Sequence, residues 1–417
     1  MELKRVVVTG LGALTPLGNS VPEYWNALLA GTSGANLITR FDASKFKTRF
    51  ACELKGFNIE DHIERKEARK MDPYTHYAMV VAKQAVEDSG IALDKVNKDR
   101  VGVIWGSGIG GLYTFQQECF NFALGDGTPR FNPFFIPKMI ADIASGFISI
   151  QYGFRGPNYT TVSACASSNN AIIDSYNYIR LGKADVFVTG GSEAAITEAG
   201  LGGFNALKAL SENNENFSTA SRPFDQTRDG FVLGEGGGCL ILESLDHALA
   251  RGAKIYAEVI GGGMSADAYH ITAPHPEGLG ALNVMRAALE DAEIKPEDID
   301  YINVHGTSTP LGDVQEAKAI QHVFGEHAYN LNISSTKSMT GHLLGAAGAI
   351  EAIATIMAVQ NNIVPPTINF ANPDPELDPK LNFTFNKAQA RTVNVAMSNT
   401  FGFGGHNTSA VFRKWEG

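Results

Sequence analysis

Two similar stretches of the chain decide its fold. Residues 85–91 read AVEDSGI and precede the β-branched run VGVIWG at 101–106. Residues 288–294 read ALEDAEI and precede the run YINVHG at 301–306. The end of an amphipathic helix is thus followed twice by a strand pattern that ends in glycine, which predicts an internal duplication.

The order of the surrounding segments supports this interpretation. Strand patterns at 5–10 and 254–261 open the two copies, and each copy later has a polar loop, a helix and a further strand, at 184–191 and at 393–398. Any long α/β chain repeats such patterns to some degree, but the matching heptapeptides favour duplication.

We therefore expect an α/β protein of two related halves, residues 1–250 and 251–417. Residues 112–160 have no counterpart and are expected to be an insertion in the first half. One helix should begin at a cap formed by Asp72 and end at Gly90, and another should span 166–181.

Composition excludes several classes of protein. The 417 residues are 44% hydrophobic and 19% charged, which excludes a disordered chain or a coiled coil. A formal net charge of −10 disfavours a nucleic-acid partner, although a local basic patch remains compatible with it. With no signal sequence, no run of about 18 apolar residues and four widely spaced cysteines, we expect a cytoplasmic protein without membrane insertion.

Cys165 is the first candidate for chemistry. It follows a short β-like run, opens a helix and has small neighbours in TVSACASS at 161–168. A thiol at a helix N-terminus should have a lowered pKa, which favours the thiolate. An inert buried cysteine is the alternative interpretation, and position alone makes the two about equal.

Two histidines also lie in polar, glycine-containing loops. His305 stands at a strand end in NVHGTSTP, and His342 follows Lys337 in STKSMTGH. The apolar helix pattern at 343–360 contains a single carboxylate, Glu351, which should be costly to bury unless Lys337 pairs with it. A purely structural ion pair explains these two charges equally well.

Glycine-rich loops complete the pattern. The loop around Phe401, SNTFGFGGHN at 398–407, could supply a backbone N–H to an oxyanion, and it lacks the GK[ST] of a phosphate-binding Walker loop. The run GSGIGG at 106–111 matches a dinucleotide fingerprint only loosely. A cysteine, two histidines and a lysine on such loops indicate nucleophilic acyl transfer.

Together these motifs resemble the elongating β-ketoacyl-acyl-carrier-protein synthases, type II, of the thiolase superfamily. The resemblance covers essentially the whole chain and rests on SACA at 163–166, RPFD and RDGF at 222–231, HGTST at 305–309 and KSMTGH at 337–342. It implies a thiolase-like, five-layered αβαβα fold of two duplicated halves, usually as a homodimer.

The resemblance also implies roles. Cys165 would carry the acyl group as a thioester, and His305 and His342 would support decarboxylation of malonyl carrier protein. The backbone amides of Cys165 and Phe401 would form the oxyanion hole, and Lys337 would orient the site. Substrate contacts would come from Thr307, Thr309, Phe231 and Glu351, with Ile109 and Phe134 at the far end of the acyl pocket. No metal or separate cofactor is implied, since the substrates carry phosphopantetheine.

Departures from the commoner motifs occur after the nucleophile, at 167–170, and at His406. They affect the expected shape of the acyl pocket. A degradative thiolase would need a second cysteine where Phe401 stands, and an initiating synthase would have Asn in place of His342.

An acidic enzyme with an acidic carrier protein needs a local basic patch. We expect it at Arg65, Lys66, Arg69 and Lys70, on one face if 63–70 is helical, with Lys208 joining it. The main hypothesis is fatty-acid elongation. The alternatives are a polyketide-type ketosynthase, a non-condensing chain-length partner subunit and, more distantly, a Cys-His hydrolase.

Overall fold

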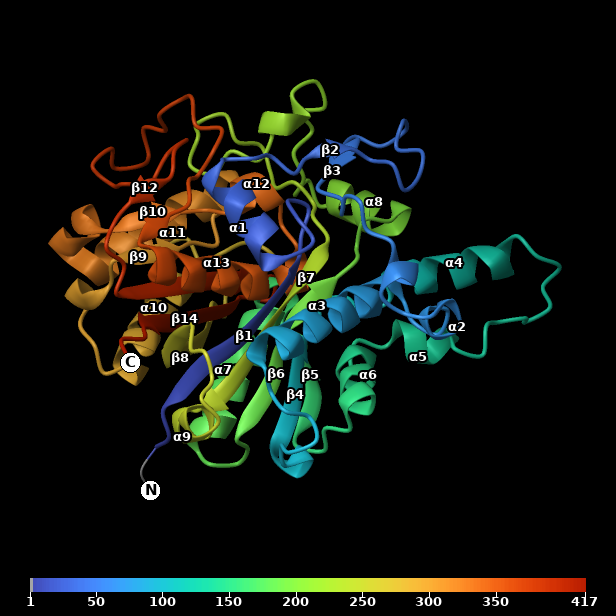
Figure 1. Ribbon diagram of the computed structural model, residues 1–417. Helices are drawn as coiled ribbons and strands as arrows, with labels where there is room; N and C mark the ends of the chain where they lie inside the picture. Colours follow the sequence, from blue (N-terminus) through green and yellow to red (C-terminus); the bar gives the residue numbers. More distant parts are fainter. Residues whose placement is uncertain (1–2) are drawn as a thin grey trace.

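A single large mixed sheet forms the centre of the computed structural model, which describes residues 3–417. Its ten strands follow the order β10-β9-β13-β14-β8-β1-β7-β6-β4-β5 (Figure 1). The bounds of these strands are β1 Val6–Leu14, β4 Val101–Gly106, β5 Asn158–Thr161, β6 Val186–Glu193, β7 Gly236–Ser244, β8 Ala257–Ala266, β9 Tyr301–Asn303, β10 Asn332–Ser334, β13 Val395–Gly402 and β14 His406–Lys414. Two short ribbons pair β2 (Asn36–Leu37) with β3 (Phe50–Ala51) and β11 (Ile363–Val364) with β12 (Gln389–Ala390).

The sheet repeats the same strand pattern on both sides of its centre. From β1 outward the chain places β7, β6, β4 and β5, and from β8 outward it places β14, β13, β9 and β10. In both directions the two inner pairings are antiparallel and the two outer pairings are parallel. This arrangement agrees with the expected duplication, while the boundary near residue 250 stays a prediction.

The sheet has two arms, β1-β7-β6-β4-β5 and β8-β14-β13-β9-β10. Helices form three layers, one between the two arms and one on the outside of each. The α-helices are α1 Val21–Leu29, α2 Arg65–Ala68, α3 Pro73–Ser89, α4 Leu112–Ala123, α5 Phe135–Met139, α6 Ile143–Tyr152, α7 Ser167–Arg180, α8 Glu198–Ala206, α9 Leu245–Ala250, α10 Leu279–Asp291, α11 Pro310–Phe324, α12 Lys337–Thr340 and α13 Ala347–Asn361. Helices α7 and α13 pack against each other and against strands of both arms, while α3 covers β1, β7 and β6 and α10 covers β8 and β14. The chain is therefore a five-layered αβαβα fold, as expected.

Local signals placed several helix ends correctly. The Asp72 side chain accepts a hydrogen bond from the N–H of Tyr74 at the start of α3, and Gly90 ends that helix in the left-handed conformation. The helix expected at 166–181 begins one residue later, after the short 3₁₀ turn Ala164–Ala166. The strand expected at 254–261 is shifted, since β8 runs Ala257–Ala266.

The two central helices begin in the same way. A 3₁₀ turn, Ala164–Ala166, precedes α7, and another, Leu344–Ala346, precedes α13. Each turn begins with a non-glycine residue in the left-handed region, with φ of 51° at Ala164 and 50° at Leu344. This conformation costs roughly 1 kcal/mol per residue, so surrounding contacts must hold both turns in place.

One stretch, Leu344–Asn361, is long and apolar enough to cross a membrane, with a mean hydropathy of 1.2. The sequence-based expectation that no such stretch exists was therefore too strict. In the folded chain, 83% of the stretch is buried, because α13 lies between the two arms of the sheet. We describe it as the core helix of a globular fold.

A projecting segment extends from the first half. Helices α4 and α5, with the loop between them, stand out from the main body beside α2 (Figure 1). This projection belongs to the stretch that has no counterpart in the second half. Its position at the edge of the fold agrees with an insertion.

Candidate active site

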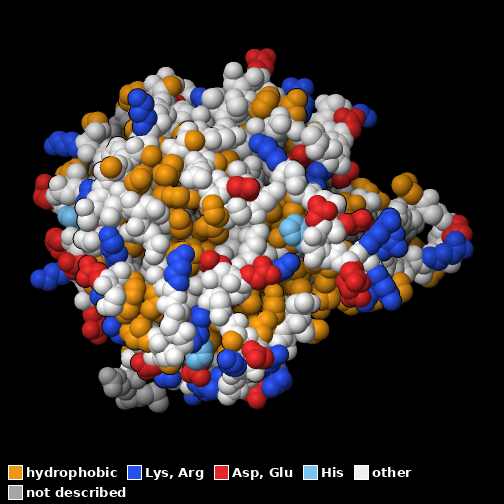
Figure 2. All heavy atoms as spheres, in the orientation of Figure 1, with side chains coloured by type: hydrophobic (Ala, Val, Ile, Leu, Met, Phe, Trp, Pro, Cys, Tyr) orange, Lys and Arg blue, Asp and Glu red, His pale blue; other side chains and the backbone are white. Residues whose placement is uncertain are grey.

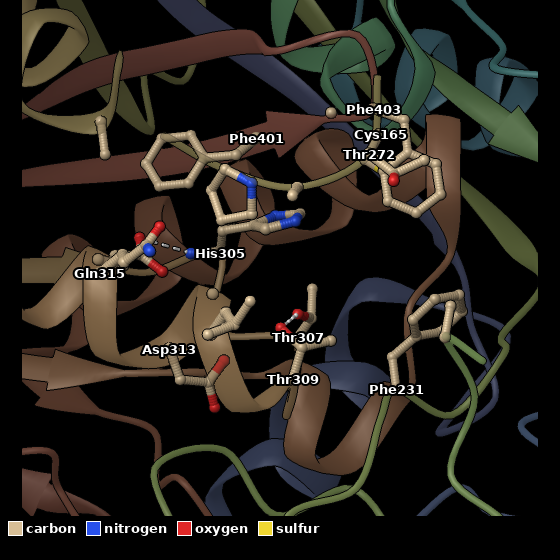
Figure 3. A pocket seen from close by; sticks show the side chains of 18 of the residues that line it. Cys165, Phe231, Thr272, His305, Thr307, Thr309, Asp313, Gln315, Phe401 and Phe403 are labelled. Atoms are coloured by element: carbon tan, nitrogen blue, oxygen red, sulfur yellow. Dashed lines mark hydrogen bonds between the residues drawn. The ribbon is translucent and has the colours of Figure 1, made fainter. Parts of the chain in front are cut away.

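A cavity of about 530 Å³ lies where the two halves meet. Cys165 reaches it from the first half, and His305, His342 and Phe401 reach it from the second. Figure 3 shows Cys165, His305 and Phe401 around this cavity, with Thr307 and Thr309 on the wall across from Phe401. The structure thus brings together the nucleophile and both histidines that the sequence indicated.

Glycines allow the backbone to close around Cys165. A Cβ on Gly402 would lie 2.6 Å from the carbonyl oxygen of Ser163 and 3.1 Å from the N of Cys165. A Cβ on Gly106 would lie 2.4 Å from the backbone of Ser168. Only glycine fits at such distances, so both glycine-rich loops pack directly against the turn that carries the thiol.

The thiol is not the activated thiolate that its position suggested. Cys165 is 8% exposed, and burial raises its pKa to about 12, with the Lys337 charge opposing that effect. It also lies in the 3₁₀ turn ahead of α7 instead of within the helix. Desolvation is therefore the largest effect on the thiol, and the expectation of a lowered pKa was wrong.

His342 is the closest titratable neighbour of the nucleophile. Its Nε2 lies 3.0 Å from Sγ of Cys165, within hydrogen-bonding distance. The N–H of His342 donates to the carbonyl oxygen of Val232, and its ring meets Phe231 edge-on with centroids 5.2 Å apart. These contacts fix the orientation of the imidazole toward the thiol.

His305 stands beside His342, with ring centroids 5.3 Å apart and an interplanar angle of 86°. Its backbone is held by Glu316, a buried carboxylate that accepts hydrogen bonds from the N–H groups of His305 (2.9 Å) and Gly306 (2.8 Å). The sequence-based interpretation missed Glu316, which follows His305 by eleven residues on α11 and has no local motif of its own.

Both imidazoles are neutral. Burial, followed by the positive charge of Lys337, lowers the pKa of His305 and of His342 well below the ordinary value. A neutral imidazole carries one N–H donor, so the pair presents hydrogen-bond donors to the cavity without a full positive charge. That arrangement suits an oxygen on which negative charge develops during a reaction.

Lys337 and Glu351 form an ion pair behind the cavity. Their side chains are 1% and 0% exposed, and neither lines the cavity wall. Burial raises the pKa of Glu351 to about 7, while Lys337 opposes this shift. The predicted pairing is present, but Glu351 is not placed to touch a substrate, because α13 holds it inside the core.

The loop after β13 places a different residue beside the thiol from the one expected. The Phe401 ring lies next to His305, with centroids 5.6 Å apart. Figure 3 places Phe403 beside Cys165. A hydrogen bond from the Phe403 backbone opposes part of the rise in the pKa of Cys165. The two residues share one short motif, so only the path of the hairpin distinguishes them.

Other predicted substrate contacts fall into two groups. Thr307 and Thr309 line the cavity with their hydroxyl oxygens 3.0 Å apart, and Phe231 lines it as well. Ile109 and Phe134 do not line it and are 40% and 42% exposed. The sequence-based interpretation missed a further part of the cavity wall, between Asp267 and His275, where Thr272 lines the cavity.

The basic patch is smaller than expected. Helix α2 is a single turn, and Arg65 and Lys70 pair with Glu60 (3.3 Å) and Glu67 (2.7 Å). Lys66 and Arg69 stay exposed, and neither forms an ion pair within residues 3–417. They line a groove with Phe134 and neighbouring residues of the α4–α5 loop, whereas Lys208 lies at the Cys165 cavity and does not join them.

Comparisons with known proteins agree with this geometry. Family models described as the N-terminal and C-terminal domains of beta-ketoacyl synthase match residues 3–248 and 256–371. A relative from Synechocystis, named 3-oxoacyl-[acyl-carrier-protein] synthase 2, is 51% identical over 416 residues, covering 100% of this chain and 99% of its own length.

Solved structures of ketosynthases superpose on the whole chain. The ishigamide ketosynthase/chain length factor superposes with a TM-score of 0.92 at 34% identity, covering 99% of this chain and 100% of its own. A type II polyketide ketosynthase, solved in complex with its acyl-carrier protein, superposes with a TM-score of 0.89 at 33% identity, with 99% and 100% covered.

Proposed function

We propose roles for the residues around Cys165 from the premise that the chain belongs to the type II β-ketoacyl-acyl-carrier-protein synthases of the thiolase superfamily. The protein is an acyltransferase of fatty-acid biosynthesis, and acyl carrier protein is its partner. It joins an acyl group held on a cysteine to malonyl carrier protein with loss of carbon dioxide. Each cycle lengthens the acyl chain by two carbons.

The first step forms an acyl-enzyme at Cys165. Sγ attacks the carbonyl carbon of the acyl carrier protein thioester, and the thiol proton passes to the phosphopantetheine thiolate that leaves. Because the pKa of the Cys165 thiol is raised, the developing thiolate needs a hydrogen-bond donor. The Nε2–H of His342, with Nε2 3.0 Å from Sγ, is that donor. The N–H groups of Cys165 and Phe403 take the tetrahedral oxyanion.

The second step breaks a carbon–carbon bond in malonyl carrier protein. The electron pair left by carbon dioxide moves onto the thioester oxygen, and His305 and His342 donate hydrogen bonds to it. The resulting enolate carbon attacks the acyl group on Cys165. Thr307 and Thr309 bind the phosphopantetheine arm, and burial together with the charge of Lys337 keeps both imidazoles neutral. The substrates carry every reacting group, so we propose no metal or further cofactor.

One observation supports this assignment most directly. Cys165 and two neutral histidines converge in one cavity from different halves of the chain. A Cys-His hydrolase needs only one histidine, as the base for its cysteine, whereas two neutral donors side by side suit an enolate oxygen.

The product formed without a reductant distinguishes fatty-acid from polyketide chemistry. With acyl and malonyl carrier proteins and no reductase, we expect one condensation per acyl chain and a β-ketoacyl product, measured by mass spectrometry of the carrier protein. Repeated condensation of the unreduced chain would support a polyketide-type ketosynthase. Free fatty acid would support a hydrolase, and no product would support a non-condensing partner subunit.

We propose the groove beside α2 as the docking site for acyl carrier protein. The positive charges of Lys66 and Arg69 are exposed and unpaired within the described residues, and Arg130 lies across the groove. Figure 2 shows lysine and arginine side chains gathered near the projecting segment of this acidic molecule. Such a local patch can attract an acidic carrier protein.

Charge reversal in this groove should weaken the binding of acyl carrier protein and leave the chemistry at Cys165 nearly unchanged. Lys66→Glu with Arg69→Glu should raise KM for acyl carrier protein about tenfold or more, because two attractive contacts become repulsive. Activity on a small thioester mimic should change less than about twofold. Equal losses on both substrates would contradict the docking site.

The matched control is Lys95→Glu with Lys183→Glu. These exposed residues precede β4 and β6 and do not line the groove beside α2, so the control changes the same charge outside the groove. A similar rise in KM in the control would show a general charge effect instead of docking.

We also propose that the protein is a cytoplasmic homodimer. Strand β5 lies at an open edge of the large sheet, and the projecting segment exposes many apolar side chains. These include Phe115, Phe120, Phe122, Phe131, Phe134 and Ile136. An open strand edge beside exposed aromatic residues suits a second copy of the chain.

A further inference from the structure

Glu193 is a buried carboxylate for which the reaction scheme above has no role. It ends β6, is 0% exposed and accepts four hydrogen bonds. The donors are the N–H groups of Gly108 (2.7 Å), Ile109 (3.2 Å) and Gly345 (3.0 Å) and the hydroxyl of Ser107 (3.2 Å). The carboxylate therefore binds main chain from two separate loops.

These loops belong to different halves of the chain. Gly108 and Ile109 lie in the glycine-rich loop after β4. The family resemblance places this loop at the far end of the acyl pocket, beyond the cavity that Cys165 lines. Gly345 lies in the turn before α13, three residues after His342. A Cβ on Gly345 would lie 2.2 Å from the N of Gly108 and 2.6 Å from Oε2 of Glu193, so the two loops touch at this carboxylate.

Glu193 is held differently from two other buried carboxylates, Glu235 and Glu243. Glu235 and Glu243 are each held by an arginine, Arg40 and Arg251. Within residues 3–417, Glu193 has no such ion pair, and burial raises its pKa to about 7. The carboxylate of Glu193 therefore binds backbone N–H groups of two loops, where Glu235 and Glu243 bind a guanidinium.

We propose that Glu193 is a positioning residue that clamps the Ile109 segment to the turn after His342, and thereby sets which acyl chains Cys165 accepts. If the far end of the acyl pocket lies at the Ile109 segment, a long acyl chain reaches this segment, whereas a short chain and the malonyl group do not. The proposal rests on the assignment of the acyl pocket to this loop.

The test variant is Glu193→Gln. An amide has one acceptor oxygen, and if that oxygen keeps Gly108 and Gly345, the NH₂ group faces the N–H of Ile109. We expect the ratio of kcat/KM for acylation by dodecanoyl over butyryl carrier protein to fall about tenfold. Malonyl carrier protein decarboxylation should stay within about twofold of wild type.

Two further variants serve as controls. Glu243→Gln removes another fully buried carboxylate, at the end of β7, and should leave the acyl-chain ratio unchanged. Ser107→Ala removes one donor and leaves the carboxylate, so it should shift the ratio in the same direction by a smaller factor. If Glu193→Gln does not fold, Ser107→Ala decides the question, and an unchanged ratio there overturns the clamp.

The remaining outcomes separate the clamp from the pocket assignment. Ile109→Ala should also change the acyl-chain ratio. If it does while folded Glu193→Gln does not, the clamp is wrong and the pocket stands. If Ile109→Ala leaves the ratio unchanged, the pocket assignment and the route through Ile109 are both wrong. Parallel losses of acylation and decarboxylation in Glu193→Gln would also overturn the proposal.

Discussion

Cys165→Ala should abolish condensation, with a loss of at least about 10⁴-fold in kcat, because no other side chain can hold the acyl group. Decarboxylation of malonyl carrier protein should persist, since it depends on His305 and His342. Both are measured in one experiment, as β-ketoacyl product and as released carbon dioxide.

The matched control for this variant is Cys119→Ala. Cys119 is exposed on α4 and lies outside the cavity, so its removal should leave condensation near the wild-type rate. Condensation that survived in Cys165→Ala would show that Cys165 is not the nucleophile. Loss of decarboxylation in parallel with condensation would show that the two steps do not use separate groups.

Lys337→Met should destabilise the protein by about 3–5 kcal/mol, because it leaves Glu351 buried without a partner. Adding Glu351→Leu in the same chain should recover most of that stability, since a buried ion pair often contributes little beyond an apolar pair. Urea unfolding of the single and double variants, followed at fixed protein concentration, measures both changes.

An exposed ion pair supplies the control. Lys83 and Glu87 are 54% and 67% exposed on α3, with 3.8 Å between their charged atoms. Lys83→Met should cost less than about 1 kcal/mol. Equal destabilisation by Lys83→Met and Lys337→Met would contradict the assigned burial, and a double variant no more stable than Lys337→Met would contradict the pairing.

The repeated strand and helix order could be predicted because it is local in sequence. Asp72 and Gly90 carry their own start and stop signals, and the two heptapeptides mark equivalent places in the halves. The layers of the fold came from family resemblance, because pairing of β1 with β8 joins strands about 250 residues apart and no local pattern specifies it.

The site was predictable in its residues and less so in its electrostatics. Cys165, His305 and His342 follow from loop position and motif, and the structure places them together. The pKa of Cys165 could not be predicted, since it depends on burial by both halves. The choice between Phe401 and Phe403 depends on how one hairpin turns, and two phenylalanines in one motif look alike in sequence.

The paired turns before α7 and α13 have an evolutionary consequence. A duplicated ancestor would have carried two equivalent turns at its centre, and in this chain position 165 holds the thiol where position 345 holds a glycine. The turn of the first half holds the reacting side chain of Cys165. The turn of the second half holds Gly345, which packs against Gly108 in the loop after β4. The two copies thus specialised in opposite directions, and neither is sufficient as an enzyme without the other.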